Sequence, residues 1–83
     1  MRLAKYVKFR EEKFGGVLFE TRSEKVFTLN SVATAVVREI VAGHPAPEIV
    51  KHMKERFRDP DQAIEKEAEA FIADLRAKGL AED

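Results

Sequence analysis

The stretch FETRSEKVFTLN, residues 19–30, decides the fold of this chain. Its second half, KVFTL, is rich in the β-branched and aromatic residues that favour strands. The polar segment TRSE before it is typical of a short turn. From Asn30 onward the spacing of apolar residues changes from 2, the period of a strand, to 3.6, the period of a helix. The stretch therefore predicts the end of a β-hairpin followed directly by a helix.

The turn sets the register of the hairpin. If residues 22–23 form a two-residue turn, Glu20 faces Lys25, and these two would form a cross-strand ion pair worth a few tenths of a kcal/mol. The turn lacks an Asn-Gly signature, and a slip of one residue would exchange the two faces of the hairpin.

In this register the hairpin is apolar on both faces. Leu18, Phe27 and Leu29 share one face, which is predicted to be the core side. Phe19 and Val26 share the other face. They are either covered by the first strand or the N-terminus, or they stay at the surface for a partner.

The rest of the chain extends this pattern into one domain over residues 1–83, enough for one small domain and not two. Three strands are followed by three helices, which predicts an α+β fold with a three-stranded antiparallel sheet and a winged helix-turn-helix outline. The predicted strands are residues 5–12, 16–21 and 25–30, and the predicted helices are residues 31–42, 46–57 and 60–78.

Several residues mark the helix ends. Asn30 or Ser31 can cap the first helix, and Gly43 can end it. The clearest boundary is residues 59–62, DPDQ, which match a capping box at the start of the third helix. The predicted apolar stripe of the first helix comprises Val32, Val36, Val37, Ile40 and Val41.

Composition indicates a cytoplasmic protein. The chain has no cysteine, which is unusual for a small secreted domain. Its charged start has no apolar run of signal-peptide length, and nothing approaches the roughly 20 apolar residues of a membrane span. The net charge is zero, yet residues 1–58 hold 12 basic and 7 acidic side chains, whereas residues 59–83 hold 3 basic and 8 acidic ones.

Catalytic and metal-binding patterns are missing from the sequence. His44 precedes a proline, and His52 follows eight residues later on the polar side of a predicted helix, a spacing that matches no metal-ligand motif. Both are expected to face solvent. The sequence therefore predicts neither an enzyme nor a bound cofactor.

A winged-helix DNA-binding regulator is the alternative that the helix-turn-helix outline raises. The reading helix of such a protein would be the third one. Here that segment is acidic, and an acidic helix repels the phosphate backbone that supplies most non-specific affinity. The sequence therefore predicts no nucleic-acid partner.

Peptide recognition fits the hairpin better. The third strand is the last of the sheet, so one of its edges is expected to have unpaired N–H and C=O groups. An extended peptide can dock on such an edge as an added strand, with main-chain hydrogen bonds for affinity and side-chain pockets for selectivity.

Three segments carry a family resemblance: GVLFETRSEKVFTLNSVATAVVREI, PEIVKHMKERF and EAFIADLRAKGL. Together they resemble the PqqD family of pyrroloquinoline quinone biosynthesis and the related leader-peptide recognition elements of ribosomally made, modified peptides. The resemblance spans roughly residues 5–80. One departure is GHPAPEIV, where relatives often have a Ser or Thr cap.

The resemblance implies a winged-helix domain that binds peptide, not DNA. The leader of a precursor peptide would lie antiparallel along the third strand, in a groove closed by the third helix. The Lys25 and Glu67 charges would pair with leader charges, and Leu75 is also explained as plain core. The implied peptide-binding residues are Lys25, Val26, Phe27, Thr28, Leu29, Ile64, Glu67, Ala68, Phe71 and Leu75.

The resemblance also implies a second partner, a modifying enzyme that is commonly a radical S-adenosylmethionine enzyme. Its cofactor would belong to that enzyme, because this chain lacks the cysteines that hold an iron–sulfur cluster. The chain would act as a peptide chaperone, for pyrroloquinoline quinone or for another modified peptide. The apolar outer face of the hairpin could also support a homodimer.

Overall fold

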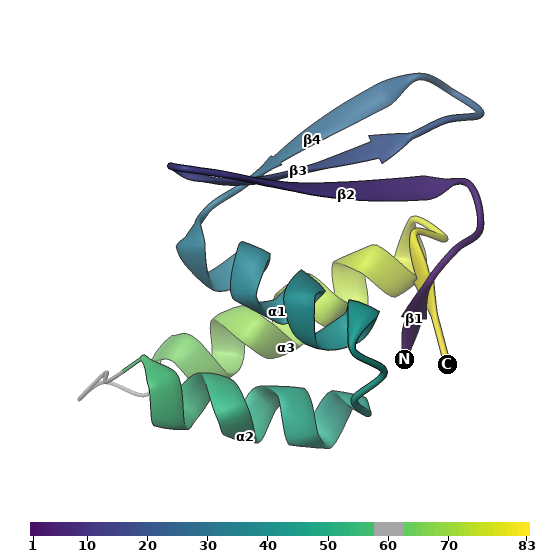
Figure 1. Ribbon diagram of the computed structural model, residues 1–83. Helices are drawn as coiled ribbons and strands as arrows, with labels where there is room; N and C mark the ends of the chain where they lie inside the picture. The colour runs from purple at the N-terminus through teal and green to yellow at the C-terminus, as the bar shows by residue number, and fades with distance from the viewer. Residues whose placement is uncertain (58–62) are drawn as a thin grey trace.

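The structure, a computed structural model, describes residues 1–57 and 63–83. A three-stranded antiparallel sheet is followed by three helices (Figure 1), which confirms the predicted α+β fold. The predicted capping box at 59–62 and a helix start at 60 lie outside the described residues. The sheet consists of β2 (Val7–Glu12), β3 (Gly15–Glu20) and β4 (Lys25–Leu29), and the helices are α1 (Ser31–Val41), α2 (Ala46–Arg56) and α3 (Ala63–Ala77).

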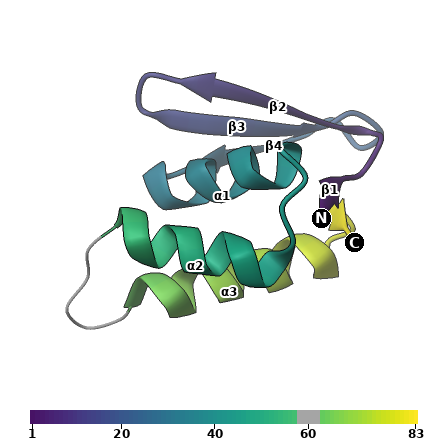
Figure 2. The ribbon, with the colours of Figure 1, turned by 60° about the horizontal axis from the view of Figure 1, so that its bottom comes forward.

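Helix α1 lies beneath the sheet, with α2 and α3 on its other side (Figures 1 and 2). It is therefore enclosed from two directions, and all six residues from Val32 to Val37 are buried. The side chain of Asn30 caps this helix by accepting a hydrogen bond from the Ala33 N–H at 2.8 Å, as predicted. Val41 was predicted on the buried stripe, but it is 60% exposed because it lies at the last turn, beyond the layers that enclose α1.

The hairpin has the predicted register, with Glu20 opposite Lys25 and Leu18 opposite Phe27. The predicted Glu20–Lys25 ion pair is wrong. The Glu20 carboxylate instead accepts hydrogen bonds from the backbone N–H groups of Arg22 and Ser23 at 2.7 and 3.2 Å, and also from the Ser23 hydroxyl. These donors lower the pKa of Glu20. The Glu20 carboxylate therefore stabilises the turn at 21–24 and does not pair with Lys25.

A second, two-stranded sheet joins the chain termini and was not predicted. Strand β1 (Arg2–Leu3) pairs antiparallel with β5 (Ala81–Glu82), as Figure 1 shows beside the end of α3. The Tyr6 hydroxyl donates to the carbonyl oxygen of Gly79 at 2.8 Å. The predicted first strand at 5–12 begins only at Val7, because residues 5–6 form the turn between β1 and β2. Among the described residues, no helix combines the length and the apolarity that crossing a membrane requires.

Two glycines with positive φ offer a matched stability test. Gly15 has φ +153°, and a methyl group there would collide with the carbonyl oxygen of Leu29 in β4. Gly43 has φ +92° and open space around it. We expect Gly15→Ala to lower the free energy of unfolding by about 3 kcal/mol, because strain and a backbone clash add. Gly43→Ala should cost about 1 kcal/mol from strain alone. Urea unfolding of both variants checks this, and equal losses would contradict it.

The two histidines are half-buried and face each other, contrary to the expectation that both face solvent. The ring centroids of His44, in the α1–α2 connection, and His52, in the middle of α2, are 5.4 Å apart. Nδ1 of His52 lies 2.6 Å from a Glu39 carboxylate oxygen, and Glu48 lies 3.4 Å from His44. The cluster thus ties α1 to α2 through charge.

This cluster predicts a pH-dependent stability. The hydrogen bond that the His52 ring donates to the Glu39 carboxylate raises the pKa of His52 above its ordinary 6.5. Protonated His52 therefore stabilises the fold below that ordinary value, and this contribution disappears as the pH rises through the raised pKa of the folded state. We expect His52→Gln to lower the free energy of unfolding more at about pH 5–6 than at about pH 8. Glu39→Gln should likewise reduce the change of the unfolding free energy with pH, measured by chemical unfolding. If this pH dependence is the same in the native chain and in both variants, the assignment to His52 is wrong.

Candidate functional site

Strand β4 forms one edge of the three-stranded sheet, in the order β2-β3-β4. It pairs with β3 along one side, and no strand within residues 1–57 and 63–83 pairs with its other side. In an edge strand, alternate residues direct their N–H and C=O groups away from the sheet. The edge of β4 is therefore open to another backbone.

A groove accompanies this edge, because α3 passes beside β4 without closing on it. Its central cavity has a volume of about 140 Å³. Phe27 and Phe71 are half-buried and contribute one aromatic ring from each side, while Leu80, which lies between α3 and β5, completes the wall. The lining residues are Leu18, Phe27, Thr28, Leu29, Phe71, Asp74, Leu75, Lys78 and Leu80.

The groove continues towards the turn at 21–24 into a wider cavity of about 340 Å³. Lys25 and Lys78 both line it, so this end of the groove is cationic. The Lys78 ammonium pairs with the Asp74 carboxylate at 2.6 Å and lies 5.7 Å from the centroid of the Phe27 ring. Glu20 also lines this cavity, but its carboxylate is held by the turn. Among residues 1–57 and 63–83 no ion pair involves Lys25, so its charge is the unpaired one at this end.

The outer face of the sheet carries the other apolar residues of the hairpin. Val26 is 60% exposed and Phe19 is 37% exposed, and the two lie opposite each other in the register. Phe19 is also opposite Lys8 of β2. Neither the first strand nor the N-terminus covers Val26, which leaves it available at the surface.

The structure brings most of the predicted site residues together, but not all of them. Lys25, Phe27, Thr28, Leu29, Phe71 and Leu75 line the two cavities of the groove. The others lie elsewhere. Val26 lies on the exposed outer face of the sheet, Ile64 is half-buried against the core, Glu67 is exposed on α3, and Ala68 is fully buried. None of these four lines the groove.

Sequence reasoning missed Asp74, Lys78 and Leu80. A signal for two of them was present, since Asp74 and Lys78 follow Phe71 by three and seven residues, the spacing of one helix face. Leu80 follows the end of α3, and its place in the groove wall depends on the turn at Gly79, which has φ +71°.

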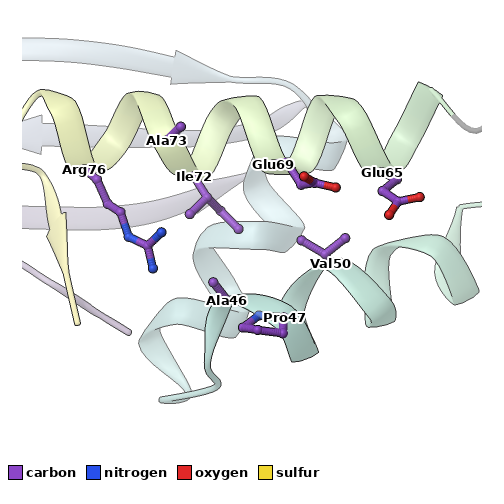
Figure 3. A pocket seen from close by; sticks show the side chains of 8 residues that line it. All are labelled: Ala46, Pro47, Val50, Glu65, Glu69, Ile72, Ala73 and Arg76. Carbon is purple, nitrogen blue, oxygen red and sulfur yellow. The ribbon is translucent and has the colours of Figure 1, made fainter.

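A larger cavity lies on the opposite side of α3, between α2 and α3 (Figure 3). Its volume is about 460 Å³, and it is remote from β4. Within the described part of the chain, no group of three or more histidines and acids is arranged to hold a metal ion.

Two solved structures share this fold. One, described as "Lasso peptide synthetase B1 complexed with the leader peptide", is 22% identical and superposes with a TM-score of 0.80, over 99% of this chain and 96% of that one. The other, "TbiB1 in Complex with the TbiA(beta) Leader Peptide", is 20% identical with a TM-score of 0.82 and covers all of both chains. Among curated protein sequences, none matches this chain.

The sequence itself places the chain in a family. Residues 15–81 match the family described as Coenzyme PQQ synthesis protein D (PqqD), a range that includes the open strand β4 and both walls of the groove. This confirms the resemblance seen in the sequence. The chain belongs to the PqqD family.

Proposed function

We propose that this chain binds the leader segment of a ribosomally made precursor peptide and presents it to a modifying enzyme. The observation that carries the proposal is the unpaired edge of β4 beside a groove walled by β4 and α3. A peptide strand added there would complete the sheet with main-chain hydrogen bonds and send alternate side chains into the groove. The two similar structures, each described as a leader-peptide complex, support it.

The roles of the groove residues follow from their positions. Phe27 and Phe71 would enclose an apolar leader side chain, while Val26 and Thr28 would flank the leader backbone. Lys25 would attract an acidic residue where the leader passes the turn end of β4, because no described side chain neutralises it.

Three of the predicted residues that do not line the groove would contribute less to leader binding. Glu67 is exposed and can meet a basic leader residue where the peptide reaches the N-terminal half of α3. Ile64 and Ala68 support α3 from the core side, so their contribution is to hold the groove wall in place.

Presentation requires no catalytic group in this chain. A bound leader raises the effective concentration of the attached core peptide at the enzyme. We propose a radical S-adenosylmethionine enzyme as that partner, with its cofactor held by the enzyme, in a pathway to pyrroloquinoline quinone or to another modified peptide. The lack of cysteine favours a reducing cytoplasm as the compartment. The outer face with Phe19 and Val26 would be the homodimer surface if the chain pairs.

The DNA-binding alternative is not favoured. In a winged-helix regulator the helix after the turn reads the major groove. Here α3 carries Glu65, Glu67, Glu69 and Asp74 against Lys66 and Arg76. Phosphates would meet a net negative surface, which opposes binding.

Calorimetric titration tests the proposal. The leader of a precursor peptide, identified from the neighbouring reading frames, should bind with a dissociation constant in the micromolar range or tighter, and a scrambled leader should not. Duplex DNA is the parallel titrant. Tight, sequence-specific binding of duplex DNA together with no response to the leader would overturn the proposed function.

A further inference from the structure

The cavity between α2 and α3 forms a second groove, which the proposed leader contacts do not use. Ala46, Pro47 and Val50 line it from α2, while Ile72 and Ala73 line it from α3 (Figure 3). These five side chains make an apolar floor. Its volume of about 460 Å³ is large enough for one or two apolar side chains of a partner.

Charged side chains rim this α2–α3 groove unevenly. Glu65 and Glu69 lie one turn apart on α3 and point towards the groove, and Arg76 lies at its other end (Figure 3). Glu65 is paired with Lys54 at 3.4 Å, and Arg76 is paired with Asp83 at 2.7 Å. Within the described residues Glu69 has no ion pair. The free charge of the rim is therefore negative.

Helix α3 separates the two grooves. Phe71 and Leu75 face the β4 side, whereas Glu69, Ile72 and Ala73 face the α2 side. A partner in the α2–α3 groove would leave the edge of β4 open, so both sites can be occupied at once.

We propose that the α2–α3 groove docks a helix of the modifying enzyme, one that presents an apolar side chain beside a Lys or Arg. The apolar residue would fill the space between Val50 and Ile72, and the cation would pair with Glu69. This inference rests on the proposed function, because it assigns the enzyme's contact. An acidic helix would be repelled by the same rim.

Synthetic helices test this directly. The probes are two peptides of about 18 residues, long enough for partial helicity. Both carry two leucines one turn apart, and they differ only in having two Arg or two Glu on the next turn. We expect the basic peptide to bind at least about fivefold more tightly than the acidic one at low salt. Binding should shift the amide signals of α2 and of the α2-facing side of α3 in nuclear magnetic resonance spectra.

Two variants at exposed alanines of α3 locate the contact. Ala73→Trp fills the groove and should abolish binding of the basic peptide, whereas Ala70→Trp, at an exposed position that does not line the groove, should leave it intact. Leader affinity should be unchanged in both variants. Equal binding of the two peptides, or no effect of Ala73→Trp, would overturn the docking proposal while leaving leader binding untouched.

A second copy of the chain is the competing occupant. Phe14 is 74% exposed beside Lys13 at the tip of the β2–β3 hairpin, so this tip also combines an apolar and a basic side chain. If the chain self-associates in analytical ultracentrifugation, and Phe14→Ser and Ala73→Trp each abolish the association, the groove binds the chain itself and the enzyme assignment is wrong.

Discussion

Val26→Pro should weaken leader binding by about tenfold while the chain stays folded. We expect Val26 to direct its N–H away from the sheet, towards the added strand. Proline removes that donor and fixes φ, so the leader loses at least one main-chain hydrogen bond and its close approach to β4. One such bond is worth about 0.5–1.5 kcal/mol, and 1.4 kcal/mol corresponds to tenfold in affinity. Calorimetric titration with the leader measures the loss.

Val26→Ala is the matched control. It removes the exposed side chain but keeps the N–H, so it should change leader affinity much less than proline does. Because Val26 is 60% exposed, truncation should also shift stability by only about 0.5 kcal/mol. If both variants weaken binding equally, the side chain carries the interaction and strand addition at this residue is wrong. If Val26→Pro binds normally, the open edge is not the binding site.

Phe71→Ala and Leu75→Ala should distinguish a residue that binds the leader from one that stabilises the core. Leu75 is 2% exposed, and its truncation should cost about 2–5 kcal/mol of folding free energy. That is a large share of the stability of a domain this small. Phe71 is half-buried at the groove wall, so its truncation should cost less stability but reduce leader affinity by about 10-fold to 30-fold.

Phe57→Ala is the control for Phe71, because Phe57 is also a half-buried aromatic residue, and it lies at the end of α2 and not in the groove. It should lose comparable stability and keep full leader affinity. Thermal unfolding and titration of the three variants give both quantities. Unchanged leader affinity in Phe71→Ala would show that the Phe71 ring does not contribute to leader binding. Leu75 would then be a core residue with no role in the site.

Much of the fold follows from local pattern. The alternation of Phe27 and Leu29 with Val26 and Thr28 indicates which face of β4 meets the core, and the register predicted from a turn at residues 22–23 is confirmed. The change of period at Asn30 fixes where the sheet ends. The β1–β5 sheet could not be predicted, because two-residue strands carry no periodicity and their pairing joins residues 80 positions apart. The position of Val41 was misjudged because a stripe on a helix does not show where the covering layers stop.

The candidate site is less predictable than the fold, because it depends on the distance between two elements. Sequence pattern marks β4 as an edge strand and Phe71 as inward-facing, and both lie at the groove. Ala68, however, has no exposed surface, which lets α3 pack closely against the core. Periodicity alone does not distinguish the residues of an apolar helix face that are buried in the core from those that line a groove.

The strand-addition claim is tested most directly by amide hydrogen exchange of β4 with and without the leader. Saturation with the leader should slow exchange at the outward N–H groups of Val26 and Thr28, and nuclear Overhauser contacts should join β4 to the leader backbone in an antiparallel register. A bound leader that leaves β4 exchange unchanged, with its contacts confined to the α2–α3 groove or the outer face of the sheet, would contradict the account.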